Sequence, residues 1–228
     1  CEVALSKNLT MVFDATCPLL NKVHVEIKNL HRQNYTIIMI GHKGHPEVEG
    51  TMGQVTDHIH LIENEADIDS LLIPRDIEKI AVVTQTTLSG DETKSIIAKL
   101  MQVFSNLRLP KNEDICYATQ NRQDAVKEMA EYCDVVLVIG SKNSSNSNRL
   151  KELAENLGVK AYLIDFDYEI QGEWLNDAST VGVTAGASAP EVLVEGVIKR
   201  LQQQGFLTTE ILNVVEEHMT FALPSELR

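Results

Sequence analysis

Two stretches decide the fold of this chain: Ile37-Ile38-Met39-Ile40-Gly41 and Val136-Leu137-Val138-Ile139-Gly140. They lie 99 positions apart, and each is a short apolar run that ends in glycine before a polar loop. Such runs are typical of buried parallel strands. Cys17 and Cys116 precede the two glycines by the same interval, so they are also 99 positions apart. A repeat of this length predicts two related lobes whose matched residues converge on one centre.

The rest of the chain alternates between strand and helix patterns. We expect strands at 10–14, 36–40, 58–62, 79–84, 134–139, 160–164 and 180–184. We expect helices at 18–30, 46–52, 65–72, 91–104, 123–132, 148–157 and 189–203. Strands that alternate with helices of this length predict parallel sheets, and ligands bind such sheets beyond the carboxyl ends of their strands. Every polar motif of this chain lies at such an end.

Composition excludes several classes of protein. The 228 residues carry a formal net charge of −13, which argues against a nucleic-acid partner because phosphate backbones attract clustered Lys and Arg. No apolar run approaches the roughly 20 residues of a membrane helix, and no signal peptide is visible, so we expect a cytoplasmic protein. Four cysteines without secretory features favour reduced thiols or metal ligands over a disulfide framework, and the lack of a Cys-x-x-Cys pair argues against a zinc ribbon or a thioredoxin-like site.

Two polar loops are the candidate ligand sites. Residues 41–50 hold two histidines between glycines after a strand, which suits close approach of a ligand to the backbone, although a solvated loop has the same composition. Residues 143–148 are all Ser or Asn just before a helix. One such residue suffices to cap a helix, so the run favours a helix N-terminus that also binds phosphate. No Walker A motif is present, which excludes a typical nucleoside triphosphatase.

Five motifs together resemble the hydroxymethylbutenyl diphosphate reductases, the LytB/IspH family. They are residues 14–18 (DATCP), 41–54 (GHKGHPEVEGTMGQ), 84–89 (TQTTLS), 140–150 (GSKNSSNSNRL) and 182–190 (GVTAGASAP). The resemblance implies a trefoil of three α/β lobes around an iron–sulfur cluster, with one cysteine from each lobe. It implies that this chain holds two of the three lobes, with small parallel sheets: a central lobe at 17–112 and a C-terminal lobe at 113–212. Residues 1–16 would be the remnant of a missing N-terminal lobe, and 213–228 a tail.

The family's activity is then the expected one, namely reductive dehydroxylation of (E)-4-hydroxy-3-methylbut-2-enyl diphosphate to isopentenyl and dimethylallyl diphosphate. The resemblance implies a 4Fe–4S cluster bound by Cys17 and Cys116, with a third cysteine from the missing lobe, and a ferredoxin or flavodoxin as electron donor. It implies that Glu47 is the proton donor and that Thr86 relays or positions the proton. The implied contacts of the substrate diphosphate are His45, Ser144, Ser145, Asn146 and Ser188.

Several alternatives remain open from the residues themselves. Cys1 aligns with the end of the missing lobe and is not assigned as the third ligand, and Cys133 is expected to be a core thiol. Glu49 lies close enough to Glu47 in sequence to share the proton role. The chain as a whole is alternatively a phospho-ligand-binding α/β module without redox chemistry, or an inactive fragment of the reductase.

Overall fold

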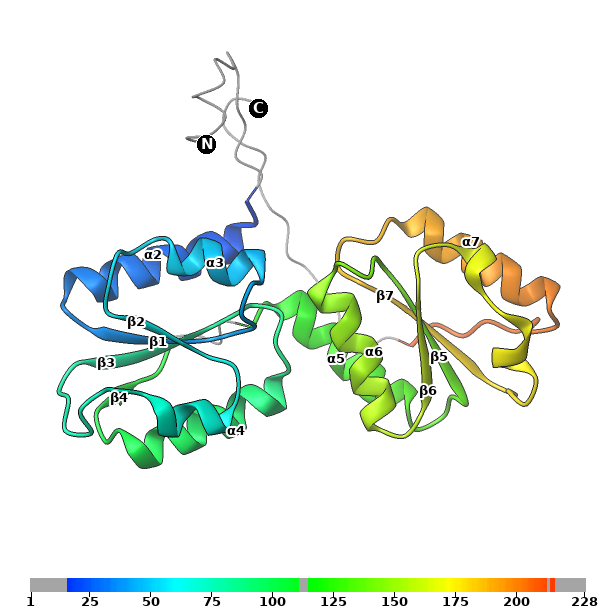
Figure 1. Cartoon of the computed structure of the whole chain (residues 1–228). Helices are drawn as coiled ribbons and strands as arrows, with labels where there is room; N and C mark the ends of the chain where they lie inside the picture. The colour runs from blue at the N-terminus through cyan, green and yellow to red at the C-terminus, as the bar shows by residue number, and fades with distance from the viewer. Residues whose placement is uncertain (1–15, 111–114, 213, 216–228) are drawn as a thin grey trace, which may run out of the picture.

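The computed structural model describes residues 16–110, 115–212 and 214–215. Within them the chain forms two parallel β-sheets, each with helices on both faces (Figure 1). We call the four-stranded sheet with its helices the central lobe and the three-stranded sheet with its helices the C-terminal lobe. The predicted α/β class with small parallel sheets is therefore confirmed. The predicted strand at 10–14 lies outside the described residues.

The central lobe alternates between strands and helices along the chain. Its elements are α2 (Pro18–Arg32), β1 (Thr36–Ile40), α3 (Pro46–Met52), β2 (Ile59–Ile62), the 3-10 helix η1 (Glu65–Ser70), β3 (Ile80–Thr84), α4 (Gly90–Val103) and β4 (Leu107–Arg108). The strand order is β2-β1-β3-β4, and Ile40 at the end of β1 pairs with Thr84 at the end of β3. The loops that follow β1 and β3 therefore start side by side at one edge of the sheet.

Both faces of the central sheet are buried. Ile37 and Met39 pack against α2 and α3, whereas Ile38 and Ile40 pack with α4 and η1 on the opposite face. In Figure 1, α2 and α3 lie above the central sheet and α4 lies below it. Burial on both faces explains why β1 reads as a continuous apolar run rather than an alternating one.

The C-terminal lobe repeats this plan with one strand fewer. Its elements are α5 (Tyr117–Met129), β5 (Val135–Ile139), α6 (Ser145–Asn156), β6 (Lys160–Ile164), the 3-10 helices η2 (Asp167–Glu169) and η3 (Gly172–Leu175), β7 (Val181–Ala185) and α7 (Glu191–Gln203). The strand order is β6-β5-β7. Val136 and Val138 pack against α5 and α6, and Leu137 packs with α7 on the other face. Cys133 packs against the α5/α6 side of this core, as predicted, and its burial raises the pKa of the thiol.

Three predicted helices differ from the structure in helix type or by more than two residues at one end. The one at 65–72 is the shorter 3-10 helix η1, which a capping box between Asn64 and Asp67 closes at its start. The one at 123–132 begins at Tyr117, because the Cys116 thiol accepts the N–H of Thr119 and caps the helix. Cysteine is not among the usual capping residues, so the sequence carries no start signal there. The third begins at Ser145 rather than 148, since Ser and Asn are tolerated in a first turn although they disfavour helix interiors.

The two lobes depart from the spacing of 99 at their third strand. The last residues of β1 and β5 pair with Thr84 and Ala185, so equivalent positions of β3 and β7 lie 101 residues apart. Ser89 and Ser188, which are 99 residues apart, are therefore not equivalent. Ser89 caps α4, whereas the N-cap of α7 is Pro190 and Ser188 lies in the loop before it.

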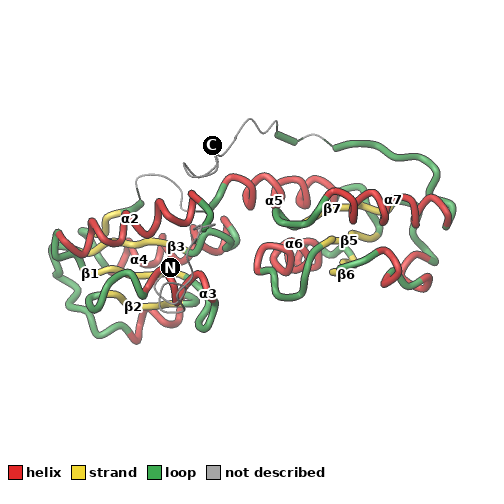
Figure 2. Tube along the Cα trace, turned by 90° about the horizontal axis from the view of Figure 1, so that it is seen from above, coloured by secondary structure: helices red, strands yellow, loops and turns green. Residues whose placement is uncertain are grey.

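The lobes meet through the α5/α6 side of the C-terminal lobe. The buried Gln123 of α5 donates to the carbonyl of Leu88 at 2.9 Å, and Lys127 of α5 pairs with Asp91 of α4 at 2.8 Å. Figure 2 shows α5 and α6 at the end of the C-terminal lobe that faces the central sheet. The edge where β1 and β3 end is thus closed by the starts of two helices from the other lobe. Over the described ranges, no helix is long and apolar enough to cross a membrane.

Candidate active site between the two lobes

The loop after β1 brings His45 and Glu47 to the edge of the central sheet. His45 is the N-cap of α3, and its Nδ1 accepts the backbone N–H of Glu47 at 3.2 Å. Pro46 occupies the first turn of α3, where its fixed φ and missing N–H cost nothing. The loop begins with a glycine, Gly41, because a Cβ at this position would lie 2.6 Å from Val48 Cγ2. The local sequence therefore places an imidazole and a carboxylate at the start of a short helix.

The carboxylate of Glu47 reaches from α3 to the loop after β3. Its Oε1 accepts the backbone N–H of Thr86 at 2.6 Å, and Thr86 itself is buried. Burial raises the pKa of Glu47 above its ordinary value, while hydrogen bonds from Thr86 and the charge of His45 oppose the rise. Since Oε1 accepts the N–H of Thr86, a proton on this carboxyl group is best held on the other oxygen, Oε2. The predicted proton donor and Thr86 are in direct contact.

Cys116 joins the same chain of contacts from the far side of Thr86. Its backbone N–H donates to the carbonyl of Thr86 at 3.0 Å. Its Sγ accepts the N–H of Thr119 at 3.3 Å and lies 2.9 Å from the Thr119 hydroxyl, so the thiol sits at the positive end of α5. A line of hydrogen bonds thus runs from Glu47 through Thr86 to Cys116.

Cys17 occupies the equivalent position of the other long helix. It is the N-cap of α2, it is exposed, and its side chain makes no capping hydrogen bond. A pocket of about 330 Å³ lies between the first turns of α2 and α5, where Lys22 and Val23 of α2 face Cys116 and Gln120 of α5. The starts of the two helices therefore share one pocket, which Cys116 lines and Cys17 does not.

These thiols fit part of a metal-binding set. Cys17 and Cys116 are both free, and each begins a long helix whose positive end suits a negatively charged cluster. Elsewhere in the part of the chain that the structure describes, no group of three or more His, Cys, Asp or Glu side chains is placed to hold a metal ion. The two cysteines match two ligands of an iron–sulfur cluster and do not form a complete set.

The start of α6 supplies the other half of the site. Ser144 is its N-cap, and the Ser144 hydroxyl accepts the N–H of Ser147 at 3.3 Å. A Cβ on Gly140 or on Gly186 would collide with the Ser147 side chain, so the two glycines let the first turn of α6 press against the ends of β5 and β7. The Ser and Asn side chains of this turn are thereby held at the sheet edge.

Asn146 is the residue of that turn that most clearly lacks a partner. It is only 6% exposed, and neither its amide oxygen nor its amide nitrogen has a hydrogen-bond partner. A buried amide without partners is costly in an otherwise well-packed protein. The arrangement therefore indicates a polar ligand at the start of α6.

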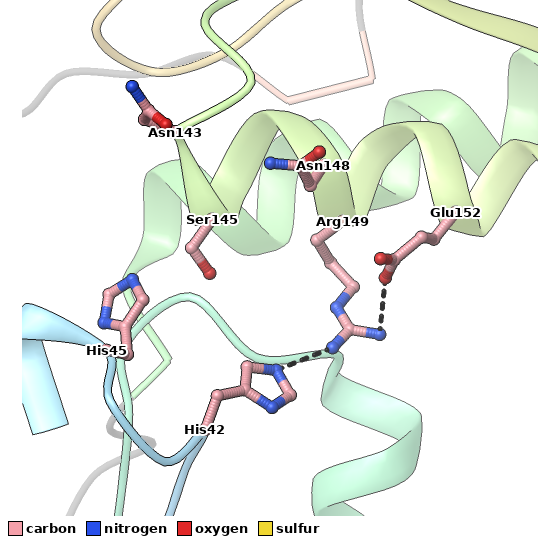
Figure 3. Close-up of a pocket in the computed structure, with 7 residues that line it drawn as sticks. All are labelled: His42, His45, Asn143, Ser145, Asn148, Arg149 and Glu152. Carbon is pink, nitrogen blue, oxygen red and sulfur yellow. Dashed lines mark hydrogen bonds and ion pairs between the residues drawn. The ribbon is translucent and has the colours of Figure 1, made fainter.

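A second pocket, of about 230 Å³, spans the two lobes there. His42 and His45 line it from the central lobe, and Ser145 and Arg149 line it from α6 together with Asn143, Asn148 and Glu152 (Figure 3). The structure thus brings the predicted diphosphate contacts His45 and Ser145 together. Ser188 is exposed in the loop before α7 and lines neither pocket, so its predicted contact stays a prediction.

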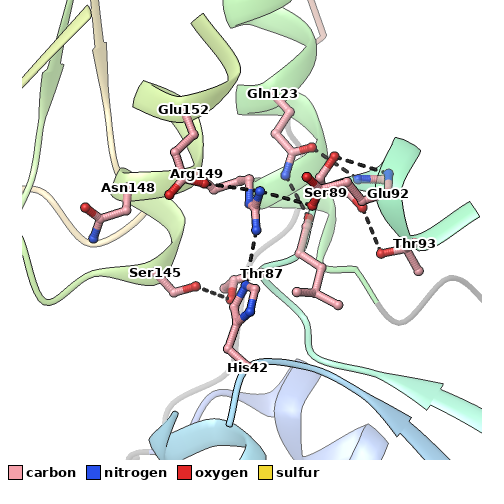
Figure 4. Close-up of polar contacts among 12 residues, drawn as sticks. His42, Thr87, Ser89, Glu92, Thr93, Gln123, Ser145, Asn148, Arg149 and Glu152 are labelled. Carbon is pink, nitrogen blue, oxygen red and sulfur yellow. Dashed lines mark hydrogen bonds and ion pairs between the residues drawn. The ribbon is translucent and has the colours of Figure 1, made fainter. Parts of the chain in front are cut away.

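Sequence reasoning missed two residues of this boundary, Gln85 and Arg149. The guanidinium of Arg149 lies 3.1 Å from His42 Nε2 and pairs with Glu92 at 3.0 Å and with Glu152 at 3.1 Å (Figure 4). Arg149 thus ties α6 to the loop after β1 and to α4. In the sequence, both residues lie inside motifs that were selected for the residues next to them, and this is the only feature that points to a role for either one.

Comparisons with known proteins identify the family of this chain. The chain matches the family model described as LytB protein over residues 1–202. The 4-hydroxy-3-methylbut-2-enyl diphosphate reductase of Psychrobacter sp. (strain PRwf-1) is 55% identical over 231 residues, covering 100% of this chain and 72% of that protein. The protein of the same name from Acinetobacter baumannii (strain ATCC 17978) is 56% identical over 221 residues, covering 95% of this chain and 70% of that protein.

Two solved structures extend the likeness to the fold. The E-1-hydroxy-2-methyl-but-2-enyl-4-diphosphate reductase of Plasmodium falciparum superposes with a TM-score of 0.91 at 34% identity, over 99% of this chain and 71% of that chain. A structure of (E)-4-hydroxy-3-methyl-but-2-enyl diphosphate reductase, described as the terminal enzyme of the non-mevalonate pathway, gives a TM-score of 0.56 at 34% identity, over 89% and 71%. A match of this extent in sequence and fold means that the chain belongs to the LytB protein family.

Proposed function

We propose that this chain acts as a 4-hydroxy-3-methylbut-2-enyl diphosphate reductase, which forms isopentenyl and dimethylallyl diphosphate by removing the substrate hydroxyl. The names of its relatives support the activity. The single observation that carries the proposal is the line of contacts from Glu47 through Thr86 to Cys116. It ties the acid of Glu47 and the backbone of Cys116 to the same residue, Thr86, so the acid lies next to the residue that would bind the cluster. Within this proposal, residues 17–112 and 113–212 are two lobes of a three-lobed enzyme.

The proposed anion site uses the pocket that spans the lobes. His45 and Ser145 line this pocket. Ser144 and Asn146 stand on either side of Ser145 at the start of α6 and do not line the pocket, and they are the further proposed donors. The N-terminus of a helix favours negative charge, and the unpartnered amide of Asn146 would gain hydrogen bonds from a bound phosphate. Ser188 would contact the same diphosphate from the loop before α7.

Glu47 is the proposed acid. The overall reaction replaces a C–O bond by a C–H bond, so it consumes two electrons and two protons, and it releases water. The raised pKa of Glu47 helps its Oε2 hold a proton, and donation of that proton lets the hydroxyl leave as water. The N–H of Thr86 on Oε1 then stabilises the carboxylate that remains. Thr86 therefore positions the acid in both of its protonation states.

Cys17 and Cys116 would bind a 4Fe–4S cluster as two of its ligands, and the third ligand of this proposal lies outside the described residues. When bound, such a cluster supplies the electrons of the reduction one at a time. A ferredoxin or flavodoxin is the proposed donor of these electrons. Free thiols at Cys17 and Cys116 suit a reducing compartment, which is why we propose a cytoplasmic location.

Anaerobic reconstitution tests the proposal. The protein, purified together with the third lobe that this proposal includes, is treated with iron and sulfide, after which bound iron, acid-labile sulfide and turnover with a reduced electron mediator are measured. We expect bound cluster and product formation, and we expect Cys116→Ser to lose both. Cys133→Ser is the matched control, because that thiol packs against the core of the C-terminal lobe away from both pockets. A chain that binds inorganic diphosphate equally well with and without iron, and never turns over, would instead be a phospho-ligand-binding module.

A further inference from the structure

Gln85 is a residue whose side chain bonds to both halves of the proposed anion site. It follows β3 and its side chain is fully buried, at 0% exposed. Its Oε1 accepts the backbone N–H of His42 at 3.0 Å, and its Nε2 donates to the hydroxyls of Thr87 at 2.9 Å and Ser145 at 3.3 Å. A Cβ on Gly41 would lie 3.1 Å from the same Oε1, so the loop after β1 is built close against this amide.

The direction of each hydrogen bond in this group follows from the donors available. A backbone N–H can only donate, so the oxygen of the Gln85 amide must face His42, and its NH₂ group must face the two hydroxyls. The amide nitrogen has two hydrogens, and Thr87 and Ser145 take one each. The Thr87 hydroxyl, which already accepts from Gln85, donates its own hydrogen to Ser145 Oγ at 3.0 Å, as Figure 4 shows.

Ser145 therefore receives two hydrogen bonds and is left with one to give. A hydroxyl has two acceptor lone pairs and one donor hydrogen, and Gln85 and Thr87 occupy both lone pairs. Ser145 lines the pocket that spans the lobes, as Figure 3 shows, so the pocket is where its hydrogen can find an acceptor. We infer that Gln85 and Thr87 are positioning residues that fix Ser145 as a hydrogen-bond donor toward the diphosphate. This inference rests on the proposed function.

The arrangement has a consequence for what the pocket accepts. A serine that is free to rotate serves equally as donor or acceptor, so it binds a phosphate oxygen or a hydroxyl with little preference. A serine held as donor favours an oxygen without hydrogen, which an ionised diphosphate offers at this position. The buried amide thereby gives the neutral Ser145 a preference for anions, in addition to the attraction of Arg149, which lines the same pocket.

Titration of the chain with inorganic diphosphate tests the inference. Gln85→Glu keeps the acceptor for His42 but presents a carboxylate to both hydroxyls, so they must donate to it instead of to the ligand. We expect diphosphate to bind about 10- to 100-fold more weakly, as for loss of a hydrogen bond to a charged group. Gln123→Glu is the matched control, because Gln123 is equally buried at the lobe boundary but bonds only to Leu88 and Gly90. It should leave binding unchanged.

Variants of Thr87 provide a second test, which introduces no buried charge. Thr87→Val removes the donor to Ser145 and should weaken binding, whereas Thr87→Ser keeps the hydroxyl and should bind like the parent chain. In a Ser145→Ala background, Thr87→Val should have no further effect, since it acts through Ser145. Thermal melting of each variant shows whether the fold is kept.

The outcomes separate this inference from the proposed function. If the parent chain does not bind inorganic diphosphate, the proposed anion site is wrong and the inference falls with it. If the parent chain binds, but Gln85→Glu and Thr87→Val bind equally well, only the inference is overturned. Additive effects of Thr87→Val and Ser145→Ala also overturn it. If Gln85→Glu does not fold, the Thr87 variants decide alone.

Discussion

The loop after β1 and the loop after β5 share one backbone design and differ in chemistry. His45 and Ser144 lie 99 positions apart, and each caps the next helix by accepting an N–H of its first turn. Two residues further on, Glu47 and Asn146 are again matched. Glu47 is a partly buried acid with a raised pKa, whereas Asn146 is a buried amide without partners. The repeated backbone therefore fixes the position of these two side chains. The residue type at that position then determines whether the side chain can transfer a proton or can contact an anion as a neutral group.

Removing the acid from the central loop should have the largest effect. Glu47→Gln keeps an oxygen for the Thr86 N–H but cannot donate an acidic proton, so we expect kcat to fall by about 100- to 10,000-fold. Anaerobic turnover assays measure it. Glu49→Gln is the control, since Glu49 follows in the same helix and is exposed. An equal loss in both variants would mean that Glu49 shares the role and that Glu47 is not the single donor.

The matched change in α6 should separate binding from stability. Asn146→Leu replaces an unpartnered buried amide by an apolar side chain of similar size, so the free energy of unfolding should rise by about 1–3 kcal/mol. Diphosphate binding should weaken about 10- to 100-fold, because the ligand loses a donor. Urea unfolding and calorimetric titration measure the two quantities. A variant that is less stable than the parent would mean that the amide has a partner within the protein.

Alanine in place of the glycines tests the shared backbone itself. Gly140→Ala should lower the free energy of unfolding by about 1–3 kcal/mol, because its Cβ would lie only 2.8 Å from Ser147 Cβ. Gly41→Ala should cost less, since its closest contact is the terminal Cγ2 of Val48, which Val48→Ala removes. Gly50→Ala is the control within α3, where a Cβ meets nothing within 4 Å. Equal losses at Gly140 and Gly50 would contradict the steric explanation.

The sequence predicted this fold well wherever the signal was local. The strands at Thr36–Ile40 and Lys160–Ile164 and the helix at Pro46–Met52 have the predicted bounds, because apolar runs and a proline mark them directly. The start of α5 was missed because a cysteine caps it, and the 101-residue offset at β7 was missed because pairing register is set by strands distant in sequence.

The site shows the same limit. His45 and Ser145 were predicted separately, and the structure places them on one pocket. Gln85 and Arg149 were not singled out, because their roles depend on hydrogen bonds and ion pairs across the lobe boundary that no spacing in the sequence reveals. The family's motifs included both residues without indicating what they bond to.

The smallest expected effect is the contribution of Glu47 to the pH dependence of the unfolding free energy. Only the loop after β1 should show it, because the matched residue in α6 does not titrate. Burial raises the pKa of Glu47 in the folded chain, so the folded state keeps a proton that the unfolded state has already lost. Stability conferred by protonation is complete below the ordinary carboxyl pKa and is lost as pH rises through the folded pKa. The difference in unfolding free energy between the parent chain and Glu47→Gln should therefore fall in urea titrations as the pH rises above the ordinary carboxyl value of 4.5. Titrating groups that do not interact with Glu47 cancel in this difference. Asn146→Leu should show no such trend, because an amide does not titrate, and a flat difference for Glu47→Gln would mean that Glu47 is not desolvated.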